Sequence, residues 1–241
     1  MKDKEIDDLL KTAARPSHEV EAVSLQRVAA SLQSSMRPVH PLPPTWVLTG
    51  ALALLCAAVA LLGAGRAGFD GFEKMDLMQR ALIFATLGVL TCLSGIWFAH
   101  EMIPGSRRWL SPGAVLGLTV LALLGVFALL FRDYHVSHFV SAGTKCLITG
   151  VIHAIPAGLL SWLVLRRGFA VNSVSAGLAA GALAGLAGVG VLELHCVNFQ
   201  AIHVLVWHTA VIPVSGASGA LVAWALRFRV GHGSHERTVS E

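Results

Sequence analysis

The sequence predicts an all-α membrane protein with six transmembrane helices and a short helical cytoplasmic head. The chain has 241 residues, of which 55% are hydrophobic and only 13% are charged, about half the charged content of an average soluble domain. Six stretches are long and apolar enough to cross a bilayer, which takes about 20 residues. This composition excludes a water-soluble domain, a disordered chain and, with only four cysteines, a disulfide-dense secreted scaffold.

Residues 1–37 are expected to form the head, as two short amphipathic helices separated at Pro16. Two such helices cannot bury a core alone, so we expect their apolar face to bind a partner protein. Binding to the lipid surface and a tail without a specific role are the alternatives. Within each predicted helix the apolar residues recur every three or four positions and therefore share one face of that helix. They are Ile6, Leu9 and Leu10 in the first helix and Leu25 and Leu32 in the second.

Residues 38–45 are rich in proline and are expected to form an extended linker between the head and the membrane. The membrane domain then covers 46–226, and a cytoplasmic tail covers 227–241. The loops between the spans are short, so a second soluble domain is not expected. The predicted spans are 46–65, 81–103, 113–131, 144–165, 174–194 and 202–226.

The basic residues predict that both termini lie in the cytoplasm, and we expect the protein in the cell inner membrane. Of the 18 Lys and Arg residues, 13 fall in the terminal segments and in the loops on the side of the N-terminus. Positive residues are retained on the cytoplasmic side, so the net charge of +4 needs no nucleic-acid partner. Five fall on the other side: Arg66, Lys74, Arg80, Arg132 and Lys145.

Histidine and cysteine residues gather at the span ends that are predicted to face outward. Six of the eleven histidines and two of the four cysteines lie there, although polar groups inside spans are costly and usually face the bundle interior. His203 is placed at the membrane edge and is left out of the candidate set. The candidates, from the ends of the last three spans, are Cys146, His153, Glu193, His195, Cys196 and His208.

Two thiols beside imidazoles at matched depth suit a soft or borderline metal. The first candidates are Cys146, Cys196 and His195, as a sensor site or a metal site. A disulfide between the two cysteines and ordinary interhelical hydrogen bonds are the alternatives. Cys56 and Cys92 lie deep in the first two spans and are expected to be apolar fillers. The auxiliary ligands would be His153, Glu193 and His208.

Small residues recur every four positions in the fifth span, which predicts close contact with neighbouring helices. They include Gly177, Gly181, Gly185 and Gly188.

Three other function classes have weaker support. In a transporter, Glu193 and the histidines would line a proton path, but duplicated halves are not evident. A haem or redox protein would place histidines across the membrane, whereas these crowd one side. Gly216–Gly219 resembles an intramembrane serine-protease motif, but Ser218 has no histidine within expected reach. We therefore expect no enzyme, no small-molecule substrate and no cofactor apart from transient binding of a heavy metal.

Several short motifs follow one another along the chain: Asp7-Asp8-Leu9-Leu10, Cys146-Leu147, Pro156, Arg166-Arg167-Gly168, the glycine-rich fifth span, Leu194-His195-Cys196 and Trp207-His208. With these motifs the sequence resembles the NrsF family of six-span membrane anti-sigma factors, which restrain an extracytoplasmic-function sigma factor called sigma-F. The resemblance implies that the head binds such a sigma factor, and that metal or oxidative stress acting at Cys146 and Cys196 releases it.

Overall fold

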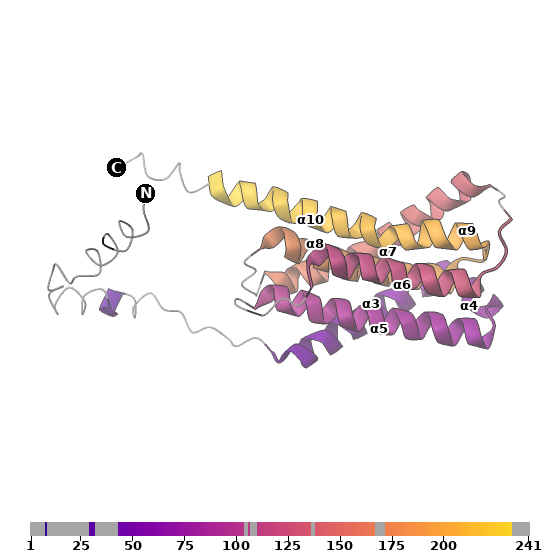
Figure 1. The fold of residues 1–241 in the computed structure, drawn as a ribbon, viewed down its shortest axis with the longest axis horizontal. Coiled ribbons are helices and arrows are strands. Elements are labelled where there is room, and N and C mark those ends of the chain that lie inside the picture. Colours follow the sequence, from indigo (N-terminus) through magenta and orange to yellow (C-terminus); the bar gives the residue numbers. More distant parts are fainter. Residues whose placement is uncertain are drawn as a thin grey trace. The chain divides into compact units, whose positions relative to one another are not determined.

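The computed structural model describes residues 8, 29–31, 43–103, 106, 110–135, 138–166 and 172–232, with side chains as far as 226. The chain divides into two units, Met1–Leu42 and Pro43–Glu241. In its described part, the second unit is a bundle of helices (Figure 1). The predicted partner-binding residues of the head lie outside the described residues: Ile6, Leu9, Leu10, Leu25 and Leu32.

Six helical segments are long and apolar enough to cross a membrane, which confirms the predicted fold class. Successive segments run in opposite directions along the bundle (Figure 1). Each coincides with one predicted span, with ends that differ by at most six residues. They are α3 (Thr45–Ala67), α5 (Leu77–Met102), α6 (Pro112–Leu130), α7 (Phe139–Leu165), α8 (Ser173–His195), and a sixth formed by α9 (Ala201–His203), η1 (Val204–His208) and α10 (Thr209–His232).

A short helix and a cap between the first two spans were not predicted. The helix α4 (Asp70–Lys74) lies between α3 and α5. The α5 helix begins four residues before the predicted span, because Asp76 caps it reciprocally with Gln79. The Asp76 side chain accepts from the Gln79 amide at 2.8 Å, and the Gln79 side chain accepts from the Asp76 amide at 3.1 Å. This capping box satisfies backbone N–H groups at the start of the helix. A prediction based on hydropathy does not include such hydrogen bonds.

The α8 helix is the centre of the bundle and packs against α10, α7, α3 and α5. In its most apolar window 89% of the residues are buried, compared with 17–44% in the other five segments. A Cβ atom on Gly181 would collide with the Ser215 carbonyl of α10, and one on Gly188 with the Gly150 carbonyl of α7. The small residues therefore let neighbouring backbones touch α8, which confirms the close packing predicted for the fifth span.

The two cysteines in the first two spans have different surroundings. Cys56 is buried in α3, and its Sγ donates a hydrogen bond to the Leu183 carbonyl of α8 at 3.7 Å. Cys92 is exposed on the surface of α5. The prediction that Cys92 fills the core is therefore wrong, because this residue lies on the side of α5 that faces away from the bundle interior.

We call the end of the bundle where α7 begins and α8 ends the cysteine end, because Cys146 and Cys196 lie there. A loop from Cys196 to Gln200 leads from α8 into α9. Asp133, after α6, pairs with Gln200 in an isolated parallel bridge. The rings of Phe131 and Phe199 stack with centroids 5.7 Å apart. The residues that directly follow α6 therefore hold the loop after Cys196 in place.

Candidate functional site

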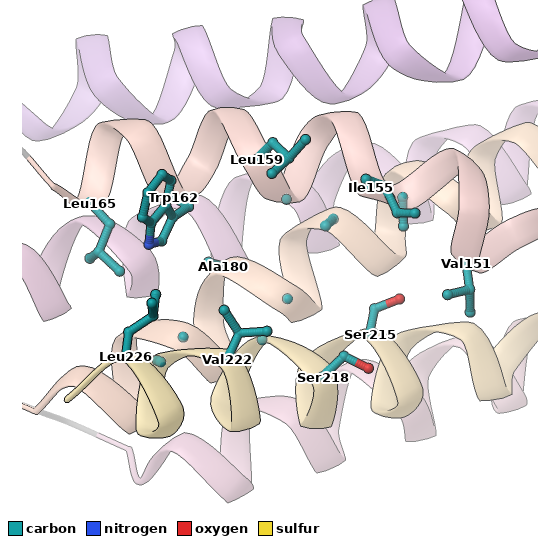
Figure 2. A pocket seen from close by; sticks show the side chains of 17 residues that line it. Val151, Ile155, Leu159, Trp162, Leu165, Ala180, Ser215, Ser218, Val222 and Leu226 are labelled. Carbon is teal, nitrogen blue, oxygen red and sulfur yellow. The ribbon is translucent and has the colours of Figure 1, made fainter. Parts of the chain in front are cut away.

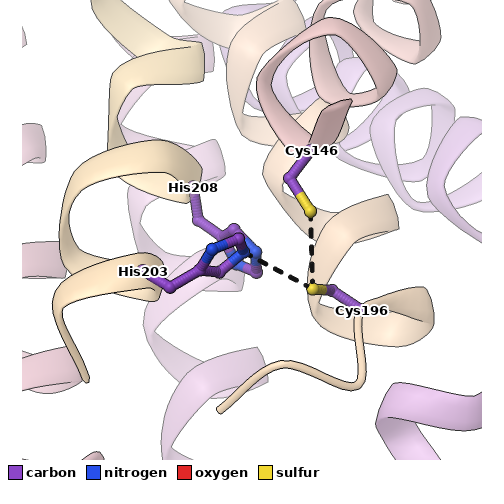
Figure 3. A group of neighbouring side chains, drawn as sticks. All are labelled: Cys146, Cys196, His203 and His208. Carbon is purple, nitrogen blue, oxygen red and sulfur yellow. Dashed lines mark hydrogen bonds between the residues drawn. The ribbon is translucent and has the colours of Figure 1, made fainter. Parts of the chain in front are cut away.

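The thiols of Cys146 and Cys196 face each other at the cysteine end (Figure 3). Cys146 lies in the second turn of α7, and Cys196 directly follows α8. Their Sγ atoms are 3.5 Å apart, a hydrogen-bond distance for sulfur, and both thiols are free. Cys196 is buried, whereas Cys146 is half-buried. Two cysteines that are 50 residues apart in sequence thus meet as one thiol pair where α7 begins and α8 ends.

Two histidines from the last span complete a compact group with these thiols. The His203 Nε2 lies 3.8 Å from the Cys196 Sγ. The His203 and His208 rings are edge-to-face with centroids 5.4 Å apart. Both imidazoles are 1% exposed. One ligand atom from each of the four residues lies within 4.8 Å of the others. We call Cys146, Cys196, His203 and His208 the Cys/His cluster (Figure 3).

A π-helical turn places both histidines on the same side of the last span. His203 and His208 are five residues apart, and an α-helix would separate such positions by about 140° around its axis. The segment between them, η1, is a π-helix, whose i to i+5 pattern brings these positions together. Trp207 of η1 packs against Phe139 with ring centroids 5.4 Å apart. It occupies the space that a Cβ on Gly143 would need.

His203 was not among the residues predicted for the site, because the sequence places it at the membrane edge. In a regular α-helix, His203 and His208 would also point in different directions. The spacing itself carries no sign of the π-helical turn. Gly71 and Gly143 have no positive φ angle and are glycines because Cys196 and Trp207, respectively, lie where a Cβ atom would be. These close contacts are visible only in the folded structure.

Glu193 lies behind the Cys/His cluster as the partner of His208. Its Oε1 is 2.6 Å from the His208 Nδ1, and both side chains are almost completely buried. When Nδ1 donates this hydrogen bond, the lone pair of a neutral imidazole is on Nε2. That Nε2 atom is buried, and the His208 side chain interacts with the Cys196 thiol. The arrangement matches the carboxylate–histidine pairs that orient metal ligands.

The structure places the other two candidate histidines outside the Cys/His cluster. His153 Nδ1 pairs with the Thr149 carbonyl of its own helix at 2.8 Å. Its ring faces α3 at Gly63. His195, in the last turn of α8, has its Nδ1 near Gly68 after α3. Of the residues singled out from the sequence, the structure therefore gathers Cys146, Cys196, His208 and Glu193.

A second feature is an apolar groove between α7, α8 and α10, with a volume of about 460 Å³ (Figure 2). The hydroxyl groups that line the groove belong to Ser215 and Ser218. The Ser218 hydroxyl donates to the Val214 carbonyl of its own helix at 2.8 Å. The residues that line the groove include no histidine, aspartate or glutamate, so this serine has no activating base there.

Comparison with protein families gives the functional class. The model of the NrsF family, described as a negative regulator of sigma F, matches residues 32–228. The chain belongs to the NrsF family. The match covers all six spanning segments and the whole Cys/His cluster. This NrsF protein is therefore a negative regulator whose partner is a sigma factor, as the sequence predicted. No curated protein and no solved structure matches the chain.

In this NrsF protein, the Cys/His cluster supports two kinds of chemistry. Two sulfur atoms and two imidazole nitrogens are a ligand set for a soft or borderline metal. Two thiols at hydrogen-bond distance are also ready to form a disulfide, with loss of two protons and two electrons to an oxidant. The hydrogen bond to Cys146, and then burial, raise the pKa of the Cys196 thiol. Without a metal this thiol is therefore protonated at neutral pH.

Proposed function

We propose that the chain is a membrane anti-sigma factor that holds an extracytoplasmic-function sigma factor at the cell inner membrane and releases it when Cys146 and Cys196 react with a metal or an oxidant. One observation carries this proposal: thiols from two different helices face each other at 3.5 Å in a member of a family of negative regulators. A chemical event at this pair changes how α7 and α8 meet.

The two halves of the proposal use different parts of the chain. Residues 1–37 bind the sigma factor through the apolar face of the head, and both termini are cytoplasmic. The cysteine end then faces outward, where stress agents arrive first. The distribution of Lys and Arg supports this orientation, because 13 of the 18 lie on the side of the N-terminus.

The energy available at the thiol pair suits a switch. A metal–thiolate bond or a disulfide contributes several kcal/mol. Moving a two-state equilibrium from 1:99 to 99:1 takes about 5.5 kcal/mol, so one such event is of the right size. The α8 helix runs from Cys196 to the opposite end of the bundle and touches α10 and α7 through glycines. A shift of α8 therefore reaches the end that faces the cytoplasm.

Membrane fractionation of the sigma factor tests this function. Cells that express the full chain should hold the sigma factor in the membrane fraction and release it to the soluble fraction after addition of Cd²⁺ or of diamide, a thiol oxidant. Cys146→Ser and Cys196→Ser should each retain the sigma factor but block its release. Cys56→Ser and Cys92→Ser are the matched controls and should release it normally.

Two outcomes contradict the proposal. If the wild-type chain never retains the sigma factor at the membrane, the chain is not its membrane anchor. If both outer-cysteine variants release it as readily as the wild-type chain, the signal is received elsewhere. Variants that never retain the sigma factor would show that Cys146 and Cys196 are structural.

A further inference from the structure

We propose that the Cys/His cluster is a tetrahedral binding site for a borderline or soft divalent cation such as Zn²⁺ or Cd²⁺, with His203 and His208 as ligands beside the two cysteines and Glu193 as the residue that positions His208. This inference deepens the proposed function. Only the regulatory consequence of metal binding rests on that function. The binding site itself rests on the geometry of the five side chains.

The distances in the Cys/His cluster are close to those of a tetrahedral site. Metal–sulfur bonds of about 2.3 Å and metal–nitrogen bonds of about 2.0–2.1 Å place two sulfurs about 3.8 Å apart and sulfur and nitrogen about 3.5 Å apart. The structure has 3.5 Å between the Sγ atoms of Cys146 and Cys196. It has 3.8 Å between the Cys196 Sγ and the His203 Nε2. Each of these two distances therefore differs from its tetrahedral value by only a few tenths of an ångström.

The fourth ligand atom is the Nε2 of His208. This atom is buried, and the His208 side chain interacts with the Cys196 thiol, one of the other proposed ligands. It lies within 4.8 Å of the other three ligand atoms. The Glu193 carboxylate at Nδ1, 2.6 Å away, keeps the proton on that nitrogen and leaves the Nε2 lone pair for the cation.

The π-helical turn is what allows both histidines to bind the same cation. It brings His203 and His208 to the same side of the last span. Such turns in α-helices often occur at functional sites. The packing of Trp207 into the space beside Gly143 holds this turn against α7, the helix that carries Cys146. The half-buried Cys146 provides the access route, because the other three ligands are buried.

Proton and charge balance also fit a divalent cation. Binding displaces the two thiol protons and any proton on the His208 Nε2, so two thiolates, two neutral imidazoles and one divalent cation leave the first coordination sphere neutral. A neutral sphere is favoured where water is excluded. The residue types select the cation. Thiolate and imidazole ligands suit Zn²⁺ and Cd²⁺, whereas Mg²⁺ and Ca²⁺ require oxygen ligands.

Titration with Co²⁺, a spectroscopic substitute for Zn²⁺, tests the site in the purified, reduced full chain in detergent. We expect one Co²⁺ per chain, with the visible absorption of tetrahedral Co²⁺ and a near-ultraviolet thiolate-to-cobalt band. Addition of Zn²⁺ or Cd²⁺ should remove both signals. His203→Gln and His208→Gln should each lose the tetrahedral absorption, and His208→Cys should restore it. Glu193→Gln should keep the absorption but weaken binding about 10- to 100-fold.

His153→Gln and His195→Gln are matched controls, because these histidines lie at the same end of the bundle outside the Cys/His cluster. They should bind Co²⁺ like the wild-type chain, and helix content by circular dichroism should be equal in all variants compared. If the full chain shows no tetrahedral Co²⁺ signal, or if His203→Gln and His208→Gln bind Co²⁺ like the wild-type chain, the proposed site is wrong.

This test is independent of the regulatory function because it contains no sigma factor. A chain that binds Co²⁺ as expected, but does not retain the sigma factor in the fractionation experiment, overturns the proposed function and supports the site. A chain that releases the sigma factor upon oxidation, but gives no tetrahedral Co²⁺ signal, overturns the site alone.

Discussion

The carboxylate of Glu193 and the imidazole of His208 form a pair 2.6 Å apart in which the side chains are only 1% and 2% exposed. A polar or charged group in such surroundings is stable only with a partner. We therefore expect strong energetic coupling between these two residues. His208→Ala alone should destabilise the bundle by about 3–5 kcal/mol, because it leaves a buried carboxylate without its partner.

A double-mutant cycle with Glu193→Ala measures this coupling. The double variant should lose clearly less stability than the sum of the two single variants, as read from thermal unfolding in detergent. Additive effects would show that the two side chains are stabilised by other groups.

Gly71 determines where Cys196 lies. A Cβ atom on Gly71 would be 2.6 Å from the Cys196 carbonyl oxygen and 3.0 Å from its amide nitrogen, and neither backbone atom can move aside easily. Gly71→Ala should therefore displace Cys196 from Cys146 and slow the formation of a Cys146–Cys196 disulfide by diamide. Mass spectrometry of alkylated peptides measures this rate.

Gly65→Ala is the control for Gly71, because a Cβ on Gly65 would meet no atom within 4 Å. It should leave the rate of disulfide formation unchanged. Equal rates in both variants would show that α4 does not position Cys196.

The head should lose the sigma factor when its apolar face becomes charged. Leu9→Asp combined with Leu10→Asp introduces two carboxylates on the predicted docking face. Burial of unpaired carboxylates at an interface is strongly unfavourable, so the sigma factor should move to the soluble fraction and its target genes should be constitutively transcribed. Lys11→Asp, on the opposite face of the same predicted helix, should retain the sigma factor. Retention by the double Leu variant would place the contact elsewhere.

The orientation of the bundle can be tested with thiol labelling and a reporter. A reporter fused after Ser240 should be active in the cytoplasm. A thiol reagent that does not cross the membrane should label Cys146 from outside, because this thiol is half-buried, and should label Cys196 poorly. Cys92 serves as the control: it is exposed on the apolar surface of α5, where a polar reagent in water does not reach it. A C-terminus outside the cell would place the Cys/His cluster on the cytoplasmic side.

The fold could be predicted from the sequence because each span is a long apolar segment, and a bilayer requires such segments to be helices. The candidate site could be predicted only in part. Hydropathy and helical rise place Cys146, Cys196, Glu193 and His208 in the same half of the last three spans. The sequence places His203 only at the membrane edge, because the π-helical turn that directs it toward His208 has no signature in hydropathy. The short α4 was missed because its five residues lie outside any apolar window.

The burial of α8 has a consequence for the order in which the protein is made. During synthesis this helix emerges before α9, η1 and α10, which supply its closest neighbour and both cluster histidines. Until the ribosome has delivered the last span, the glycine face at Gly177, Gly181 and Gly185 has no α10 backbone against it. A newborn chain thus carries Cys146 and Cys196 without His203 and His208, and the complete Cys/His cluster exists only after translation of the sixth span.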